Sequence, residues 1–196
     1  MALVAVGLCR TGHAGTVEFT PFYGYTFSGG LKDADTGENF EIDNSDSYGG
    51  MLDFRLSEIT QLEFFFSRQE TELKSDEGLF AGQTLFDLDV DYYHIGGTYL
   101  MLDGPWQPFV VGTLGATLLN PDAPGTDSLT RFSIGLGGGV RYFPIEHLGL
   151  FLAGRGFLTF IEGDTLWRTE SGGTTIMIDA NGLWQFQLQA GLIFSF

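Results

Sequence analysis

Residues 184–196 alternate between apolar side chains and mostly small or polar ones. Every second position is apolar: Trp184, Phe186, Leu188, Ala190, Leu192, Phe194 and Phe196. The positions between them are Gln185, Gln187, Gln189, Gly191, Ile193 and Ser195. A period of two predicts a β-strand with one apolar face and one small or polar face. An exposed edge on such a strand would promote aggregation, so the pattern favours a closed sheet.

Similar stretches recur along the whole chain, with turn residues between them. We expect eight strands, near residues 17–29, 47–58, 59–70, 88–102, 107–119, 129–143, 149–162 and 183–196. The connections near 58–59, 103–106 and 144–148 are short, and those near 30–46, 71–87, 120–128 and 163–182 are long. Short turns at one end and long loops at the other are typical of outer-membrane barrels. The sequence therefore predicts an all-β fold, an eight-stranded antiparallel up-and-down transmembrane β-barrel, with residues 15–196 as one domain.

The direction of the apolar face distinguishes a membrane barrel from a soluble one. In the first expected strand, Phe19, Tyr23 and Tyr25 share one face, and Glu18 lies on the other. Eight strands enclose a space only just wide enough for side chains, so this many aromatic rings would overfill it. We therefore expect the aromatic side chains to face lipid, and Gly, Ser and Gln to line the interior.

With this orientation, charged side chains point into the lumen. Three acids and three bases do so: Glu18, Asp53, Arg55, Glu63, Arg141 and Arg155. An isolated buried charge is costly, so these groups must be paired or hydrated. Two roles remain open. The pairs form a plug that fixes strand register and blocks the lumen, or they form a gate that exchanges partners and passes water or small ions.

The net charge of −16 comes from 9 basic and 25 acidic residues, and the whole excess falls at the long-loop end. An acidic rim disfavours nucleic acid as a partner, because phosphates need a basic patch. It would attract cations, and divalent ions could bridge it to anionic lipopolysaccharide. The simpler hypothesis is a set of solvated loops. Asp87, Asp89 and Asp91 share one strand face, either inward near the mouth or above the membrane.

Metal binding and catalysis have little support in the sequence. Residues 33–38 superficially resemble a calcium loop, but the glycine comes too early and the twelfth residue is Asn44. We expect no metal and no cofactor. The only histidines are His13, His94 and His147. His94 follows two tyrosines and has no serine at a supporting spacing nearby, so we expect an interface or lumen histidine and no enzyme.

The first residues suggest a processing signal. An apolar run over 2–8 precedes Cys9, and small residues surround Ala14. This is typical of the end of a signal peptide cut near Ala14. Residues 1–14 are therefore expected to be a signal-peptide remnant, with an extra strand or plug as the alternative.

Three segments resemble a known family: GLIFSF at 191–196, the glycine-rich sixth strand followed by VRYFP at 140–144, and GLFLAGRGF at 149–157. They are similar to small OmpA/OmpX-type outer-membrane β-barrels of Gram-negative bacteria. The resemblance implies a location in the outer membrane, among lipid and lipopolysaccharide. It also implies that the barrel-assembly machinery reads the last strand. The residues of this assembly signal are Leu188, Ala190, Leu192, Phe194 and Phe196.

The resulting expectation is a non-enzymatic integral outer-membrane protein with a structural or surface-interaction role and acidic extracellular loops. One alternative is a narrow porin-like channel for small solutes or ions. Another is a soluble lipocalin-like carrier of an apolar ligand, whose apolar face would line the cavity. The sequence does not identify an extracellular ligand.

Overall fold

A computed structural model describes residues 17–32, 39–75, 84–121, 128–160, 165–168, 175–178 and 182–196. Its eight long strands are β1 (Val17–Ser28), β4 (Ser45–Arg55), β5 (Thr60–Ser75), β6 (Thr84–Leu100), β7 (Trp106–Pro121), β8 (Leu129–Ile145), β9 (Leu148–Thr159) and β12 (Leu183–Ser195). Within these described ranges, no helix is long and apolar enough to cross a membrane.

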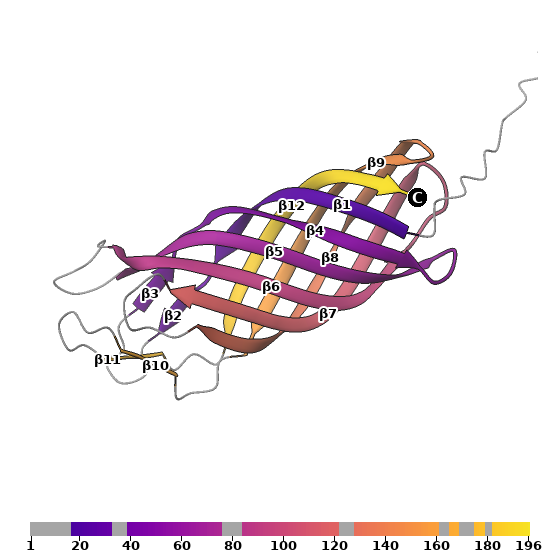
Figure 1. Ribbon diagram of the computed structural model, residues 1–196. Coiled ribbons are helices and arrows are strands. Elements are labelled where there is room, and N and C mark those ends of the chain that lie inside the picture. Colours follow the sequence, from indigo (N-terminus) through magenta and orange to yellow (C-terminus); the bar gives the residue numbers. More distant parts are fainter. Residues whose placement is uncertain are drawn as a thin grey trace, which may run out of the picture.

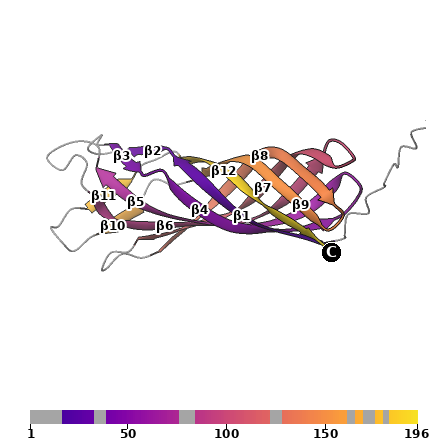
Figure 2. The same ribbon diagram turned by 90° about the horizontal axis from the view of Figure 1, so that it is seen from above.

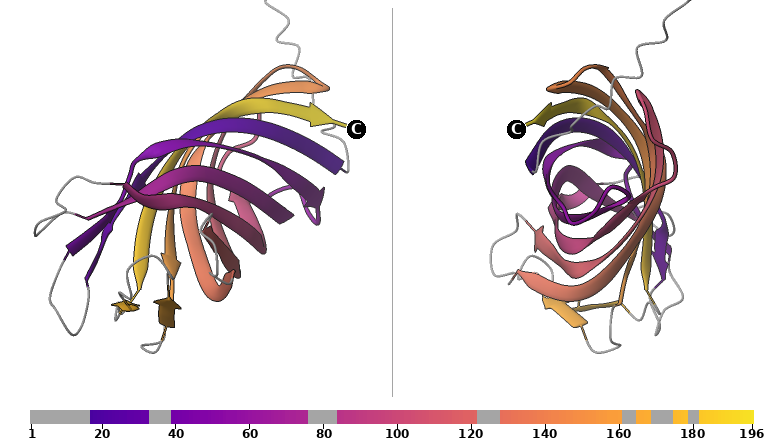
Figure 3. Two further views of the ribbon diagram at one scale, coloured as in Figure 1. Left: turned by 60° about the vertical axis from the view of Figure 1, so that its left-hand side comes forward. Right: turned by 90° about the vertical axis from the view of Figure 1, so that its right-hand side faces the viewer.

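The eight strands close into a barrel. Each long strand pairs antiparallel with the next one along the chain, and β1 pairs with β12 (Figure 1). This seam places Phe19 opposite Phe194. The strands wrap around one axis, with the indigo β1 beside the yellow β12 (Figure 3). The expected eight-stranded antiparallel β-barrel is confirmed.

The long-loop end contains more strand than the pattern predicted. β5 and β6 extend the barrel wall into the expected loop 71–87. Two short pairs also form there, β2 (Gly30–Lys32) with β3 (Asn39–Ile42) and β10 (Thr165–Arg168) with β11 (Thr175–Ile178). Figures 1 and 2 show all four short strands at the end opposite the C-terminus. The acidic side chains suggested loops, but antiparallel backbone pairing continues past these polar positions.

The outer wall carries the aromatic and aliphatic side chains that the alternation assigned to it. Phe19, Tyr23, Phe64, Leu136 and Phe186 are between 44% and 69% exposed. A continuous apolar exterior of this kind is stable against lipid, and in water it would be an aggregation hazard. The soluble-carrier alternative required these side chains to line the interior, and the structure places them outside.

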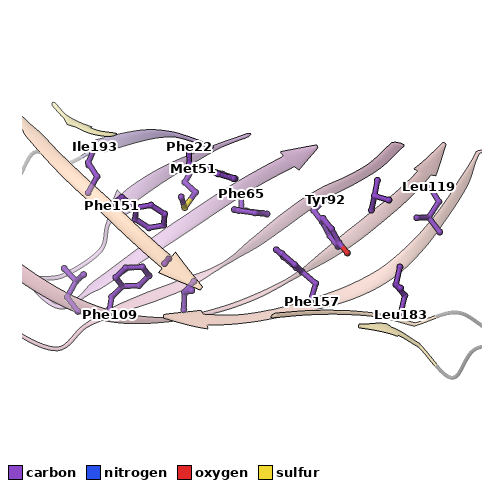
Figure 4. Packing of buried hydrophobic residues seen from close by; sticks show 14 of the residues in the cluster. Phe22, Met51, Phe65, Tyr92, Phe109, Leu119, Phe151, Phe157, Leu183 and Ile193 are labelled. Atoms are coloured by element: carbon purple, nitrogen blue, oxygen red, sulfur yellow. The ribbon is translucent and has the colours of Figure 1, made fainter. Parts of the chain in front are cut away.

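The interior corrects one expectation, because it is not lined only by small and polar side chains. Rings of Phe22, Phe65, Phe109, Phe151 and Phe157 lie inside the barrel along its length (Figure 4). Inward-facing glycines leave room for them. A Cβ atom added at Gly135, for example, would lie 3.3 Å from Phe157 Cδ1. The prediction was wrong because Phe22 and Phe65 interrupt inward faces that are otherwise polar. Spacing alone also does not show how much volume the glycines release.

Candidate functional site

Three carboxylates form a row on the inner wall near the short-turn end. Glu18 of β1 is opposite Asp53 of β4, and Asp53 is opposite Glu63 of β5. All three side chains are buried, with exposed fractions of 1%, 7% and 2%. Like charges directly opposite each other on neighbouring strands repel, so this row needs cations from elsewhere in the barrel.

Arg155 of β9 pairs with Glu63 from the opposite wall. Its Nη1 lies 2.7 Å from Glu63 Oε1, and its Nη2 lies 3.3 Å from Oε2. The Thr98 hydroxyl donates to the same Oε2 at 3.2 Å. The guanidinium also stacks over the Phe65 ring, 4.2 Å from its centroid. The pair is shielded from water. Its two hydrogen bonds, the bond from the Thr98 hydroxyl and the contact with the Phe65 ring compensate for the lost hydration of the two charges.

Glu18 is the centre of a second cluster. Arg141 Nη2 of β8 donates to Glu18 Oε2, and Arg55 Nη2 lies 3.3 Å from Oε1. Gln61 donates through Nε2 to Glu18 Oε2 at 2.8 Å, and its Oε1 accepts from Arg141 Nη1 at 2.6 Å. The Arg55 side chain is 21% exposed, so this cluster reaches solvent at the short-turn end.

Asp53 differs from its two neighbours. Among the described residues, the ion pairs inside the lumen join Glu18, Glu63 and the three arginines, whereas Asp53 takes part in none of them. Its buried Oδ1 has no hydrogen-bond partner in the described part of the barrel. The structure thus brings all six sequence-predicted interior charges into the lumen, five as ion pairs and one beside them.

His94 is part of a chain of hydroxyl groups in the middle of the lumen. Its Nε2 lies 2.8 Å from Ser133 Oγ, and its Nδ1 lies 3.0 Å from Thr113 Oγ1. Thr117 donates to Ser133 at 2.8 Å and lies 2.8 Å from Thr159 Oγ1. The expectation that no serine supports His94 was wrong, because Ser133 comes from β8, two strands away.

This serine–histidine contact does not complete a hydrolase triad. Both imidazole nitrogens contact hydroxyl groups, whereas a triad needs a carboxylate to orient the imidazole. His94 and Ser133 are also buried, with exposed fractions of 4% and 0%. The arrangement is suited to holding neighbouring strands together through side-chain hydrogen bonds inside the barrel.

Stacked rings fill the space between the two ends of the barrel (Figure 4). Tyr92 and Phe157 stack with centroids 4.2 Å apart, and Phe157 lies 5.6 Å from Phe65. Phe65 in turn stacks on Phe22 at 5.6 Å. Together with Arg155, which lies over Phe65, these rings form a column across the lumen.

Glutamines of β12 connect this strand to β4 and β5 inside the barrel. Gln187 Nε2 lies 2.6 Å from Ser47 Oγ and 2.9 Å from Ser67 Oγ. Gln185 donates to Gln69 Oε1 at 2.9 Å. Alternation assigns these positions to the polar face of the strand but does not predict a hydrogen-bond network. The signal was the repeat of glutamine at every second position from 185 to 189.

The aspartates of β6 face outward at the long-loop end. Asp91 accepts two hydrogen bonds from Arg68, at 2.7 and 2.6 Å, and Tyr48 donates to Glu70 at 3.0 Å. Inward positions of the same strand carry Leu88, Val90 and Tyr92. The inward position, one of the two expectations for these aspartates, is therefore wrong, because the structure places them on the outer wall. The calcium-like segment 33–38 and the expected signal remnant 1–14 lie outside the described residues.

The residues of the expected assembly signal lie on the outer face of β12. Leu188, Leu192, Phe194 and Phe196 are exposed by 36% to 74%. The Phe196 backbone nitrogen donates to Val17 O at 2.9 Å, next to the seam with β1. The row is therefore accessible from the membrane side of the seam.

No protein-family model and no curated protein matches this sequence. Solved structures do match. Neisserial surface protein A is similar with a TM-score of 0.64 and 13% identity, over 93% of this chain and 99% of its own. OprG from Pseudomonas aeruginosa has a TM-score of 0.62 and 13% identity, over 94% and 98%. AlkL, solved in lipid bilayers, has a TM-score of 0.59 and 13% identity, over 95% and 93%.

These similarities extend over nearly the full length of each chain, although sequence identity is low. Together with the closed strand order and the apolar exterior, they show that this chain has the eight-stranded β-barrel fold of small outer-membrane proteins.

Proposed function

We propose that the protein is a non-enzymatic integral outer-membrane barrel of a Gram-negative cell, with a structural or surface-interaction role. The observation that carries this proposal is the filled interior, in which ion pairs and stacked rings occupy the lumen. Such a barrel is a rigid wall element that holds its loops above the membrane. Its apolar exterior supports insertion into lipid.

Fractionation with heated and unheated gel samples tests the membrane assignment. A closed barrel resists detergent until it is heated, so the protein should lie in the outer-membrane fraction and change mobility on boiling. A protein found in the soluble fraction, with no change in mobility, would contradict the proposal.

The acidic end supports a surface role. Glu70 is directly opposite Asp89, and Glu72 is directly opposite Asp87, on the extended part of β5 and β6. This extension carries negative charge outward, beyond the aromatic belt. Lipopolysaccharide is the proposed neighbour, with divalent cations between its phosphates and the carboxylates.

A narrow channel is the second candidate, favoured by the buried charges. A conducting lumen needs its ion pairs to open, so neutralising Arg55, Arg141 or Arg155 should change the conductance. The structural role predicts instead that the purified protein gives no stable open state in planar bilayers. Steady single-channel currents from the wild-type protein, altered in the Arg55→Gln variant, would favour the channel.

The proposed assembly signal gives a separate prediction. Replacing Phe196 by serine should reduce the amount of folded barrel in the outer membrane several-fold while synthesis continues, because the outward row of β12 loses an aromatic contact. Quantitative blotting of membrane and total fractions measures this. Ile145→Ser, a change at the exposed last residue of β8, serves as the control. Equal membrane levels of the two variants would remove the support for an assembly signal.

A further inference from the structure

We propose that Asp53 binds one proton in the folded barrel, so that the row of three carboxylates is a proton-binding site. Two independent observations point to it. The Asp53 side chain is more than nine-tenths buried with an unpartnered Oδ1, and it lies between two other carboxylates in register. The inference does not depend on whether the barrel conducts.

The charged side chains around Asp53 are already paired with one another. Glu63 on β5 binds Arg155 of β9 through both oxygens, and Glu18 on β1 binds Arg141 of β8. Arg55, on the same strand as Asp53, contacts Glu18 and reaches solvent. An ionised Asp53 would therefore be a buried charge without a direct partner, between two like charges.

A proton removes this conflict. Neighbouring carboxylates in a low-dielectric site commonly share protons, because they cannot all ionise at close range. With Asp53 neutral, the two buried carboxylates Glu18 and Glu63 match the two buried guanidiniums of Arg141 and Arg155. The partly exposed Arg55 contacts solvent as well as Glu18, so the interior needs no third carboxylate charge.

Proton binding has a thermodynamic consequence. An aspartate in the unfolded chain ionises near pH 3.9. Above this pH the folded state would hold one proton more than the unfolded state at this position, so raising the pH opposes folding. The contribution of Asp53 should then increase the unfolding equilibrium constant about tenfold per pH unit, until Asp53 ionises in the folded barrel.

The experiment compares the full-length protein with Asp53→Asn and with the matched variant Glu63→Gln, in lipid vesicles between about pH 5 and 7. Asp53→Asn should fold with a midpoint close to that of the wild type and should lose the tenfold dependence. Glu63→Gln should be strongly destabilised, because it leaves Arg155 buried without its carboxylate. Equal destabilisation by both variants, or an unchanged pH dependence in Asp53→Asn, would overturn the proposal.

A spectroscopic readout covers the case in which Asp53→Asn does not fold. Infrared spectra of the wild-type protein with isotope-labelled aspartate should contain the C=O band of a protonated carboxyl at neutral pH. Solvent-exposed aspartates are ionised there and do not contribute. Absence of this band from the folded wild-type barrel would show that Asp53 carries a negative charge.

Discussion

Replacing Arg155 by methionine should lower the free energy of unfolding by about 3–5 kcal/mol. The change keeps much of the side-chain volume but removes the guanidinium, which is 1% exposed and paired with Glu63. Glu63 is then left as a buried carboxylate without its counter-charge, and the stacking on Phe65 is lost as well. Urea titration in lipid vesicles, read from the mobility of unheated gel samples, measures this effect.

The matched control is Arg68→Met, which breaks the ion pair with Asp91 on the outer wall. The Arg68 side chain is 36% exposed, whereas the Asp91 side chain that it pairs with is 2% exposed. Removing Arg68 from this outer surface is expected to uncover Asp91, so we expect a loss of about 1 kcal/mol, closer to that of a surface pair than to that of a pair buried on both sides. Equal losses in the two variants would mean that the interior pair is hydrated and does not act as a plug.

Introducing arginine at Leu136 should cost about 2–4 kcal/mol, because this outward side chain of β8 would place a charge in lipid. Leu136 is 69% exposed, and in a water-soluble barrel an arginine there would be tolerated. The size of the loss in unfolding free energy therefore distinguishes a lipid-facing wall from a solvated one. Equilibrium unfolding from vesicles gives the free energy.

Leu102→Arg is the control for this prediction. Leu102 is 60% exposed but lies in the short connection between β6 and β7. A charge in this turn should change stability by no more than about 0.5 kcal/mol. A loss at Leu102 as large as that at Leu136 would contradict the assignment of the membrane-spanning belt.

Alternation of side chains was sufficient to predict the barrel, because a period of two determines which face of a strand each residue occupies. It placed Glu18 and Glu63 inside correctly, since their outward neighbours are large and apolar. Arg155 also lies inside, although both of its neighbours along the strand are glycines. It did not indicate which charges meet. The pairing of Arg155 with Glu63 depends on side chains crossing the lumen from strands far apart in the sequence.

The same limit explains Ser133 and His94. Their contact depends on the register across β6, β7 and β8, which local spacing does not determine. The interior rings were missed for a different reason. Phe22 and Phe157 occupy inward positions beside the glycines at 49 and 135, where a Cβ atom would lie close to their rings. The room for these rings therefore depends on the volume of several strands at once.

The seam between β1 and β12 imposes an order on folding. Every other contact between long strands joins neighbours along the chain, whereas this one joins the first and last strands. Hairpins can therefore form early and locally, but both edges stay unpaired until the final strand is in place. Closure is a late, non-local step. A circular permutant would join the natural chain ends and open one of the short turns instead. It should keep every strand pair but move the chain ends to another seam, so its folding rate would separate the effect of chain order from that of the finished barrel.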